Sequence, residues 1–183
     1  MKLTKLIMVV LAVFMVHALG NGPAHAESAS ALNADAETAL NKLYESNSVA
    51  KMIADHSSAV LVFPNILKAG FVVGAQYGEG VLMRKGQTIG YYNIVAGSYG
   101  LQAGAQSFGY ALFLMTDSAI EYLEKSSGWE IGIGPSIVVV DEGVAKTLTT
   151  TTLKSDVYAF TFDQQGLMAG IGLQGSKITR IEK

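Results

Sequence analysis

Glycine spacing constrains this fold more than any other feature of the sequence. Of the 20 glycines, 18 lie at or after Gly70. Gly70, Gly74, Gly78 and Gly80 share parity, so in a strand they would lie on one face. Glycine weakens a strand interior and is accepted where the backbone bends or another element packs closely. The spacing therefore favours a sharply curved sheet or a closely packed helix; the alternative is a smooth groove that admits an acyl chain or another backbone.

Residues 1–26 have the composition of a secretory signal peptide. Lys2 and Lys5 precede an uncharged apolar run at 6–19, and Ala24-His25-Ala26 fits a cleavage site between small residues. The run is shorter than the ~20 residues of a membrane-spanning helix. We expect removal of residues 1–26 and a periplasmic or secreted single domain at 27–183. The alternative is an uncleaved anchor.

Composition excludes several kinds of chemistry. The chain has no cysteine, which rules out disulfides, thiolate metal sites and cysteine nucleophiles. Beyond residue 26, 11 basic residues face 15 acidic ones, so the net charge is −4. This charge disfavours nucleic acid as a partner. His56 is the one histidine left in that part, so a histidine metal site or a Ser-His-Asp triad would depend on it alone.

The apolar pattern predicts helices first and strands afterwards. One helix face carries Leu32, Ala36, Ala39, Leu40 and Leu43, and a second helical stretch carries Val49, Met52, Ile53 and His56. A further helix is expected at Asp117–Lys125. Strands are expected at 60–63 (ending at Pro64), 70–77, 79–84, 87–95, 98–107, 109–115, 130–141, 144–153, 156–163 and 167–174. This pattern predicts an α+β, β-rich single domain: a curved antiparallel or barrel-like sheet with N-terminal helices and one mid-chain helix packed on it.

The catalytic motifs in the sequence are incomplete. Residues 170–175 match the dinucleotide pattern G-x-G-x-x-G, but only eight residues follow, too few for the helix and acidic residue that the mechanism needs. Ser48-Val-Ala-Lys51 matches S-x-x-K without a later Lys-Thr-Gly. We therefore expect a protein that is not an enzyme and uses no cofactor or metal. A hydrolase remains a third hypothesis that no motif supports.

Three basic residues lie where they could contact an anionic surface. Lys68 precedes the first glycine-rich strand, and Arg84 and Lys85 lie in an expected hairpin turn with Gly86. A basic residue near an anionic bilayer contributes about 1 kcal/mol. The alternative is that these charges only keep the turn soluble.

Several ordered motifs resemble the SYLF lipid-binding domain family over about Ala39 to Ile181. They are Val60-Leu-Val-Phe-Pro64, Lys68-Ala-Gly-Phe71, Gly97-Ser-Tyr-Gly-Leu-Gln102, Gly104-Ala-Gln106, the apolar run Ala111–Thr116, Gly134-Pro135, Tyr158 and Gly166-Leu-Met-Ala-Gly170. The resemblance implies a compact β-rich domain with helices packed on it. Eukaryotic relatives bind phosphoinositide membranes and some bind actin, whereas bacterial relatives are exported.

The resemblance also guides the functional prediction. Where the family often has a tryptophan, this chain has Tyr91 and Tyr92, which can lie at a lipid interface. We predict an exported, non-enzymatic domain that binds anionic phospholipid at an envelope membrane surface. Lys68, Arg84 and Lys85 would contact headgroups, with Tyr91 and Tyr92 beside the acyl region. The alternative is an envelope structural or adaptor protein that binds another protein.

Overall fold

The computed structural model describes residues 28–125, 128–130, 133–166 and 176–183. The expected signal peptide and the expected strand at 167–174 lie outside these residues. The helices are α2 (Ala29–Ser46), α3 (Ser48–His56), α4 (Asp117–Lys125) and α5 (Glu142–Ala145). The strands are β1 (Ala59–Arg84), β2 (Gln87–Leu114), β3 (Trp129–Glu130), β4 (Ile137–Val139), β5 (Val157–Gly166) and β6 (Lys177–Ile181). The predicted α+β, β-rich class is confirmed.

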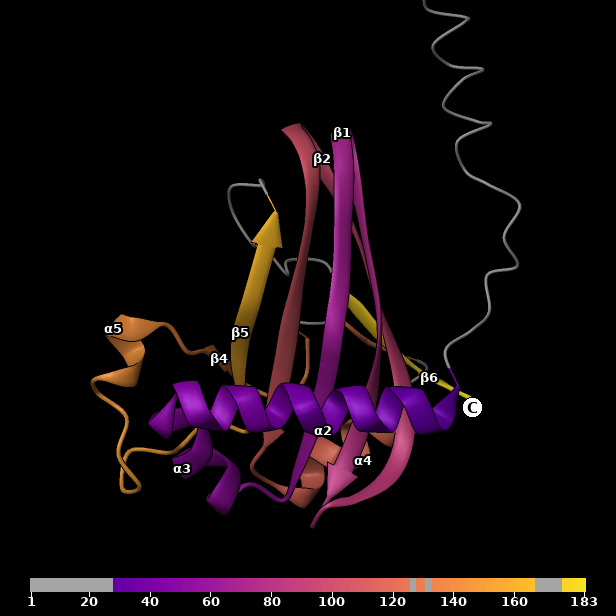
Figure 1. The fold of residues 1–183 in the computed structure, drawn as a ribbon. Helices are drawn as coiled ribbons and strands as arrows, with labels where there is room; N and C mark the ends of the chain where they lie inside the picture. The colour runs from indigo at the N-terminus through magenta and orange to yellow at the C-terminus, as the bar shows by residue number, and fades with distance from the viewer. Residues whose placement is uncertain (1–27, 126–127, 131–132, 167–175) are drawn as a thin grey trace, which may run out of the picture.

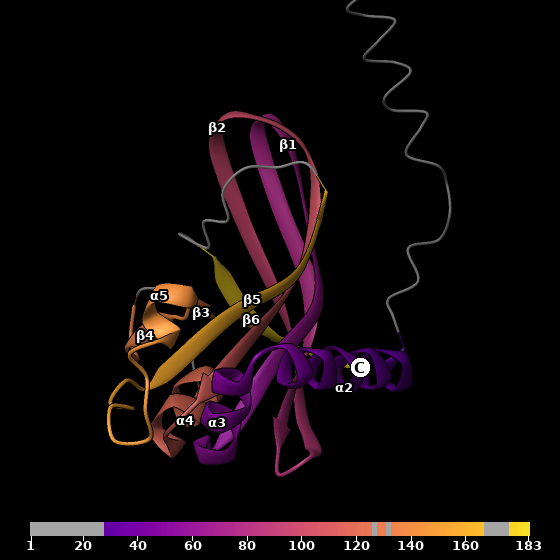
Figure 2. The same ribbon diagram turned by 60° about the vertical axis from the view of Figure 1, so that its left-hand side comes forward.

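Two long strands form most of the sheet. β1 has 26 residues and β2 has 28, and they pair antiparallel from Ala59 and Leu114 to Arg84 and Gln87. This β1–β2 ribbon rises from the helices, bends over at its far end and returns, so that its hairpin turn lies near the helices (Figures 1 and 2). The register shifts at the bend, between Phe71 and Val73. Each strand therefore supplies two halves of one curled sheet.

Pro64 does not end the first strand, contrary to the sequence prediction. β1 continues through it, and the register with β2 shifts between Phe63 and Ile66. Proline cannot donate to a sheet ladder, and an irregularity of this kind removes the need for that donor. The five strands expected between 70 and 115 are accordingly parts of two continuous strands.

The close approach inferred from the glycine spacing is confirmed where the two halves of β1 meet. A Cβ on Gly80 would lie 2.5 Å from Phe63 Cδ1 and 2.7 Å from the Val62 carbonyl oxygen. A Cβ on Gly78 would lie 2.8 Å from Ile66 Cγ1. Real Cβ atoms do not approach neighbours this closely, so glycine is required where the sheet curls back on itself.

This contact predicts a matched pair of alanine variants. Gly80→Ala should destabilise the fold by about 1–3 kcal/mol, because the Val62 carbonyl is backbone and cannot move aside freely. Gly97→Ala should be neutral or mildly stabilising, because a Cβ at Gly97 meets no atom within 4 Å. Urea unfolding of both variants measures the difference. Equal stabilities would contradict the close approach.

The remaining strands extend the curl along the edge of β2 that β1 leaves free. β5 pairs antiparallel with β2 at residues 106–114, and β6 pairs antiparallel with β2 at residues 91–95. β3 pairs with β6, and β4 pairs parallel with β5, so the sheet is mixed where an antiparallel one was expected. The strand expected at 144–153 is wrong, because this stretch holds the end of α5 followed by turns. β6 was not predicted.

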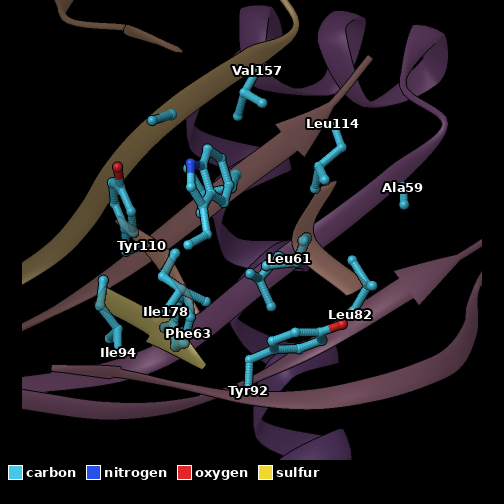
Figure 3. Close-up of a cluster of buried hydrophobic side chains, with 14 of the residues drawn as sticks. Ala59, Leu61, Phe63, Leu82, Tyr92, Ile94, Tyr110, Leu114, Val157 and Ile178 are labelled. Atoms are coloured by element: carbon cyan, nitrogen blue, oxygen red, sulfur yellow. The ribbon is translucent and has the colours of Figure 1, made fainter. Parts of the chain in front are cut away.

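Two buried clusters lie on opposite faces of the sheet. The inner face carries Leu61, Phe63, Leu82, Tyr92 and Ile94, among others, packed with α4 (Figure 3). The outer face is covered near its base by α2 and α3. The expected apolar face of α2 is confirmed, since its buried residues are Leu32, Ala36, Ala39, Leu40 and Leu43. The N-terminal helices thus cover the base of the ribbon and leave its far end uncovered (Figure 1).

Candidate functional site

Arg84 and Lys85 lie at the hairpin turn, as predicted. Arg84 Nη2 donates to Asp117 Oδ1 at 2.8 Å, an exposed ion pair at the start of α4. Lys85 has a positive φ of 50° and is exposed. In the ribbon views this turn lies at the opposite end of the molecule from the ribbon bend (Figures 1 and 2). Their contact with lipid headgroups stays a prediction.

Lys68 is not at the surface. Its exposed fraction is 4 %, and it pairs with Gln106 across the ribbon on the inner face. The shift after Phe63 places Ile66 and Lys68 on this face, so parity counted from Val60 misplaces them. Gln76 and Ser176 are also buried, and Gln76 Nε2 donates to Ser176 Oγ at 3.3 Å. Lys68 cannot meet a headgroup unless the ribbon opens.

The two tyrosines predicted at a lipid interface belong to different environments. Tyr92 is fully buried in the inner cluster, beside Leu82 (Figure 3), and burial raises the pKa of its hydroxyl. Tyr91 is half-buried on the outer face, and its hydroxyl accepts from Asn33 Nδ2 of α2 at 3.2 Å. Tyr92 is therefore a core residue rather than an interface residue, because adjacent strand residues point to opposite faces. Tyr91 anchors α2.

Among the ribbon side chains that the structure describes, the largest uncovered apolar ones lie on the outer face, beyond α2. Leu67, Tyr77 and Val95 are 55 %, 49 % and 47 % exposed. Tyr77 and Val95 are direct partners across β1 and β2. Outside positions 71–73 and 98–103, their exposed neighbours on this face of the ribbon, away from the helices, are small: Ala69, Ala75, Gly97 and Ala105. We call these seven residues the distal outer face.

Polar groups border the distal outer face toward the helices. The Tyr77 hydroxyl donates to Glu79 Oε1 at 2.7 Å, and Lys183 forms an ion pair with the same carboxylate. Burial acts to raise the pKa of Glu79, but the hydrogen bonds from Lys183 and Tyr77 outweigh it and hold this pKa below its usual value. Burial and the bond to Glu79 raise the pKa of Tyr77 to about 12. Tyr77 thus stays neutral, with its ring beside Val95 and its hydroxyl toward the charges.

This surface was not predicted from the sequence. Its signal is the exposed strand parity: outward positions 67, 69, 75, 77, 95, 97 and 105 carry no charged residue, although the outer face of a sheet exposed to water is usually polar. The parity could have been counted, but the face left uncovered depends on where α2 lies.

A groove of about 680 Å³ lies at the other end, between α2, α3 and the hairpin turn. Its apolar part includes Leu40, Val60 and Met83. Glu37, Asp55 and Lys85 supply charges of both signs around it. Tyr44 also lines it, and burial, together with Asp55, raises the pKa of Tyr44 to about 12.

The described residues contain no cluster of three or more His, Cys, Asp or Glu side chains that could hold a metal ion. His56 closes the last turn of α3, with its Nδ1 2.8 Å from the Met52 carbonyl oxygen. Among the same residues, none of the helices combines the length and hydropathy that a membrane span requires.

Comparison with known families agrees with the resemblance. Residues 95–183 match the family described as Ysc84, Las17-binding protein actin regulator. The match begins within β2 and includes α4 and β3 to β6. A search of curated proteins found no match to this chain. The predicted resemblance is thus confirmed over residues 95–183, which match the Ysc84 model of the SYLF domain.

Proposed function

We propose that this protein is an exported, non-enzymatic domain that binds phospholipid membranes of the cell envelope. The distal outer face carries the proposal. Leu67, Tyr77 and Val95 remain about half exposed, whereas outer-face apolar residues nearer the helices, such as Val62, Val81 and Phe113, are buried in the cluster that includes α2 and α3. Contiguous exposed apolar surface marks protein or membrane interaction sites. We choose lipid rather than a protein partner because the sequence motifs resemble those of SYLF lipid-binding domains, in agreement with the family match over residues 95–183.

The expected signal peptide directs the choice of partner. The family description names actin regulation. Export at residues 1–26 would separate this chain from actin, so we do not extend that partner to it. The net charge of −4 beyond residue 26 also disfavours binding driven by charge alone. Apolar contact with lipid is compatible with both features.

A second candidate is an adaptor that binds another envelope protein. The groove between α2, α3 and the hairpin turn favours it, because apolar residues are flanked there by Glu37, Asp55 and Lys85. Protein interfaces combine an apolar centre with a polar rim in the same way. This groove lies away from the distal outer face, so the two candidates use different surfaces.

Vesicle flotation separates the candidates. The chain from Glu27 onward contains every described element and lacks the apolar run at 6–19, which would bind lipid by itself. We expect it to float with vesicles that contain phosphatidylglycerol. Folded protein, checked by circular dichroism, that stays at the bottom at low salt would overturn the proposal. Crosslinking to an envelope protein through Lys85, without flotation, would favour the adaptor.

The double variant Arg84→Ala/Lys85→Ala tests which end of the molecule meets the bilayer. If the distal outer face is in contact, the hairpin turn points away from the membrane, and flotation should match that of the unsubstituted chain. A clear loss of flotation at low salt would instead assign the headgroup contact to the turn, where each basic residue contributes about 1 kcal/mol. The exposed Arg84–Asp117 pair contributes little to folding, so the variant should stay folded.

A further inference from the structure

The far end of the β1–β2 ribbon carries no charged residue on either strand. We define the distal ribbon as Ala69–Gly78 of β1 with residues 94–105 of β2, which are paired from Ala69 and Ala105 to Gly78 and Ile94. Neither segment contains an Asp, Glu, Lys or Arg. The charge-free stretch of β2 is longer still, since the chain has no charged residue from Gly86 to Thr116. In β1 the boundary is sharp, with Lys68 on one side and Glu79 on the other.

We propose that the distal ribbon penetrates the hydrocarbon of one membrane leaflet, so that the protein binds by insertion rather than by resting on headgroups. This inference rests on the proposed lipid-binding function and assigns it a depth and an orientation. A charged side chain near the bilayer centre costs about 2.5–3.5 kcal/mol. A soluble surface gains nothing by excluding charge from two neighbouring strands, whereas an inserted one requires it.

The backbone of the distal ribbon is hydrogen-bonded along the edge that β1 and β2 share. The main-chain N–H and C=O groups on that edge are therefore already satisfied when they enter hydrocarbon. β1 and β2 pair with each other up to the bend, with Phe71 opposite Ala103 and Val73 opposite Tyr99. At ~3.3 Å per residue, the arms reach about 10–20 Å beyond the boundary at Lys68 and Glu79. One leaflet of hydrocarbon is about 15 Å thick, so the ribbon spans roughly one leaflet.

The boundary residues suit the membrane–water interface. The Tyr77 ring lies beside Val95, and its hydroxyl donates a hydrogen bond to Glu79, on the side where the charged residues begin. Tyrosine favours this level of a bilayer because one end of it is apolar and the other is polar. Lys177 of β6 is exposed and pairs with Val95 on the same outer face. A lysine at this height can reach anionic headgroups while its stem stays along apolar surface.

Orientation follows from the shape. The bend lies at one end of the molecule, and α2, α3, α4 and the hairpin turn lie toward the other (Figures 1 and 2). Insertion of the bend would keep these helices outside the headgroup layer. Arg84 and Lys85 would then face away from the membrane, and Lys177 would replace them as the headgroup contact.

A single fluorescent label tests the depth directly, because the chain has no cysteine of its own. Ala75→Cys places a label on the exposed side of the distal ribbon, and Val139→Cys places the control label on β4. Each is labelled with a polarity-sensitive dye and mixed with vesicles of phosphatidylcholine and phosphatidylglycerol. We expect the emission at position 75 to rise and shift to the blue, with stronger quenching by a doxyl group on the acyl chain than on the headgroup. The label at position 139 should not respond.

The outcomes separate the depth from the function. Flotation without any response at position 75 would overturn the insertion and leave lipid binding standing. A response at position 139 with none at position 75 would place the membrane at the wrong end and also overturn it. Absence of flotation would overturn the proposed function and the insertion together. A response at position 75 to a purified soluble protein, with none to vesicles, would assign the surface to that protein instead.

Discussion

Replacing Val95 with aspartate should reduce vesicle binding at least about tenfold without unfolding the protein. Val95 is 47 % exposed beside Tyr77, so a carboxylate there reaches water in the free protein and costs little stability. In the bound state the same carboxylate would enter the apolar layer or hold the ribbon out of it. A charged side chain costs about 2.5–3.5 kcal/mol at the bilayer centre and less near the interface. A tenfold loss of binding corresponds to about 1.4 kcal/mol, which is within that range of costs.

Val139→Asp is the matched control for this variant. Val139 is 57 % exposed, on β4, a short strand at the edge of the sheet. The substitution Val139→Asp introduces the same charge at an exposed valine, as Val95→Asp does, but away from the distal ribbon. Flotation should therefore resemble that of the unsubstituted chain. Equal binding by all three proteins would place the lipid contact elsewhere, and equal losses in both variants would point to net charge rather than position.

Removing the Phe113 ring should cause a large loss of stability, about 3–5 kcal/mol for Phe113→Ala. Phe113 is fully buried in the outer cluster, where the ribbon meets α2. Its ring lies 5.4 Å from that of Phe160 at 89°, an edge-on contact, and 6.4 Å from that of Tyr44. The variant would therefore leave a cavity at the junction of β2, β5 and α2.

Urea unfolding checks the magnitude, with Val139→Ala as a surface control expected to change stability by less than about 0.5 kcal/mol. A loss below about 1 kcal/mol in Phe113→Ala would mean that α2 does not rely on this junction. Loss of α2 signal at lower urea than the loss of sheet signal would show that the helix layer unfolds separately.

Helices and turns could be predicted from the sequence where the residue pattern that specifies them lies within one short segment. The apolar face of α2 and the limits of α4 at Asp117 and Lys125 follow from helical periodicity and were predicted correctly. The turn at Arg84-Lys85-Gly86 was also predicted, and Gly86 has a positive φ of 75°. By contrast, β1 and β2 could not be recognised as continuous, because Pro64 and the glycines resemble strand breaks. These residues are accommodated within the strands only because β1 and β2 pair with each other along their length.

The site was harder to predict because it depends on which face the helices cover. Parity alone places Tyr91 and Tyr92 on opposite faces but does not say which face is buried. The register shift beside Pro64 reverses the alternation of faces along β1, and Lys68 therefore lies on the inner face. The distal outer face is left uncovered because α2 lies across the base of the ribbon rather than along it (Figure 1).

Salt dependence of flotation tests the central claim most directly. Charge-driven binding weakens steeply with salt, because the screening length falls from about 10 Å at 0.1 M to about 3 Å at 1 M. Apolar insertion is not screened in this way. The chain from Glu27 onward should therefore remain on phosphatidylglycerol-containing vesicles at about 1 M salt. Complete release at that salt, after binding at low salt, would contradict insertion of the distal ribbon.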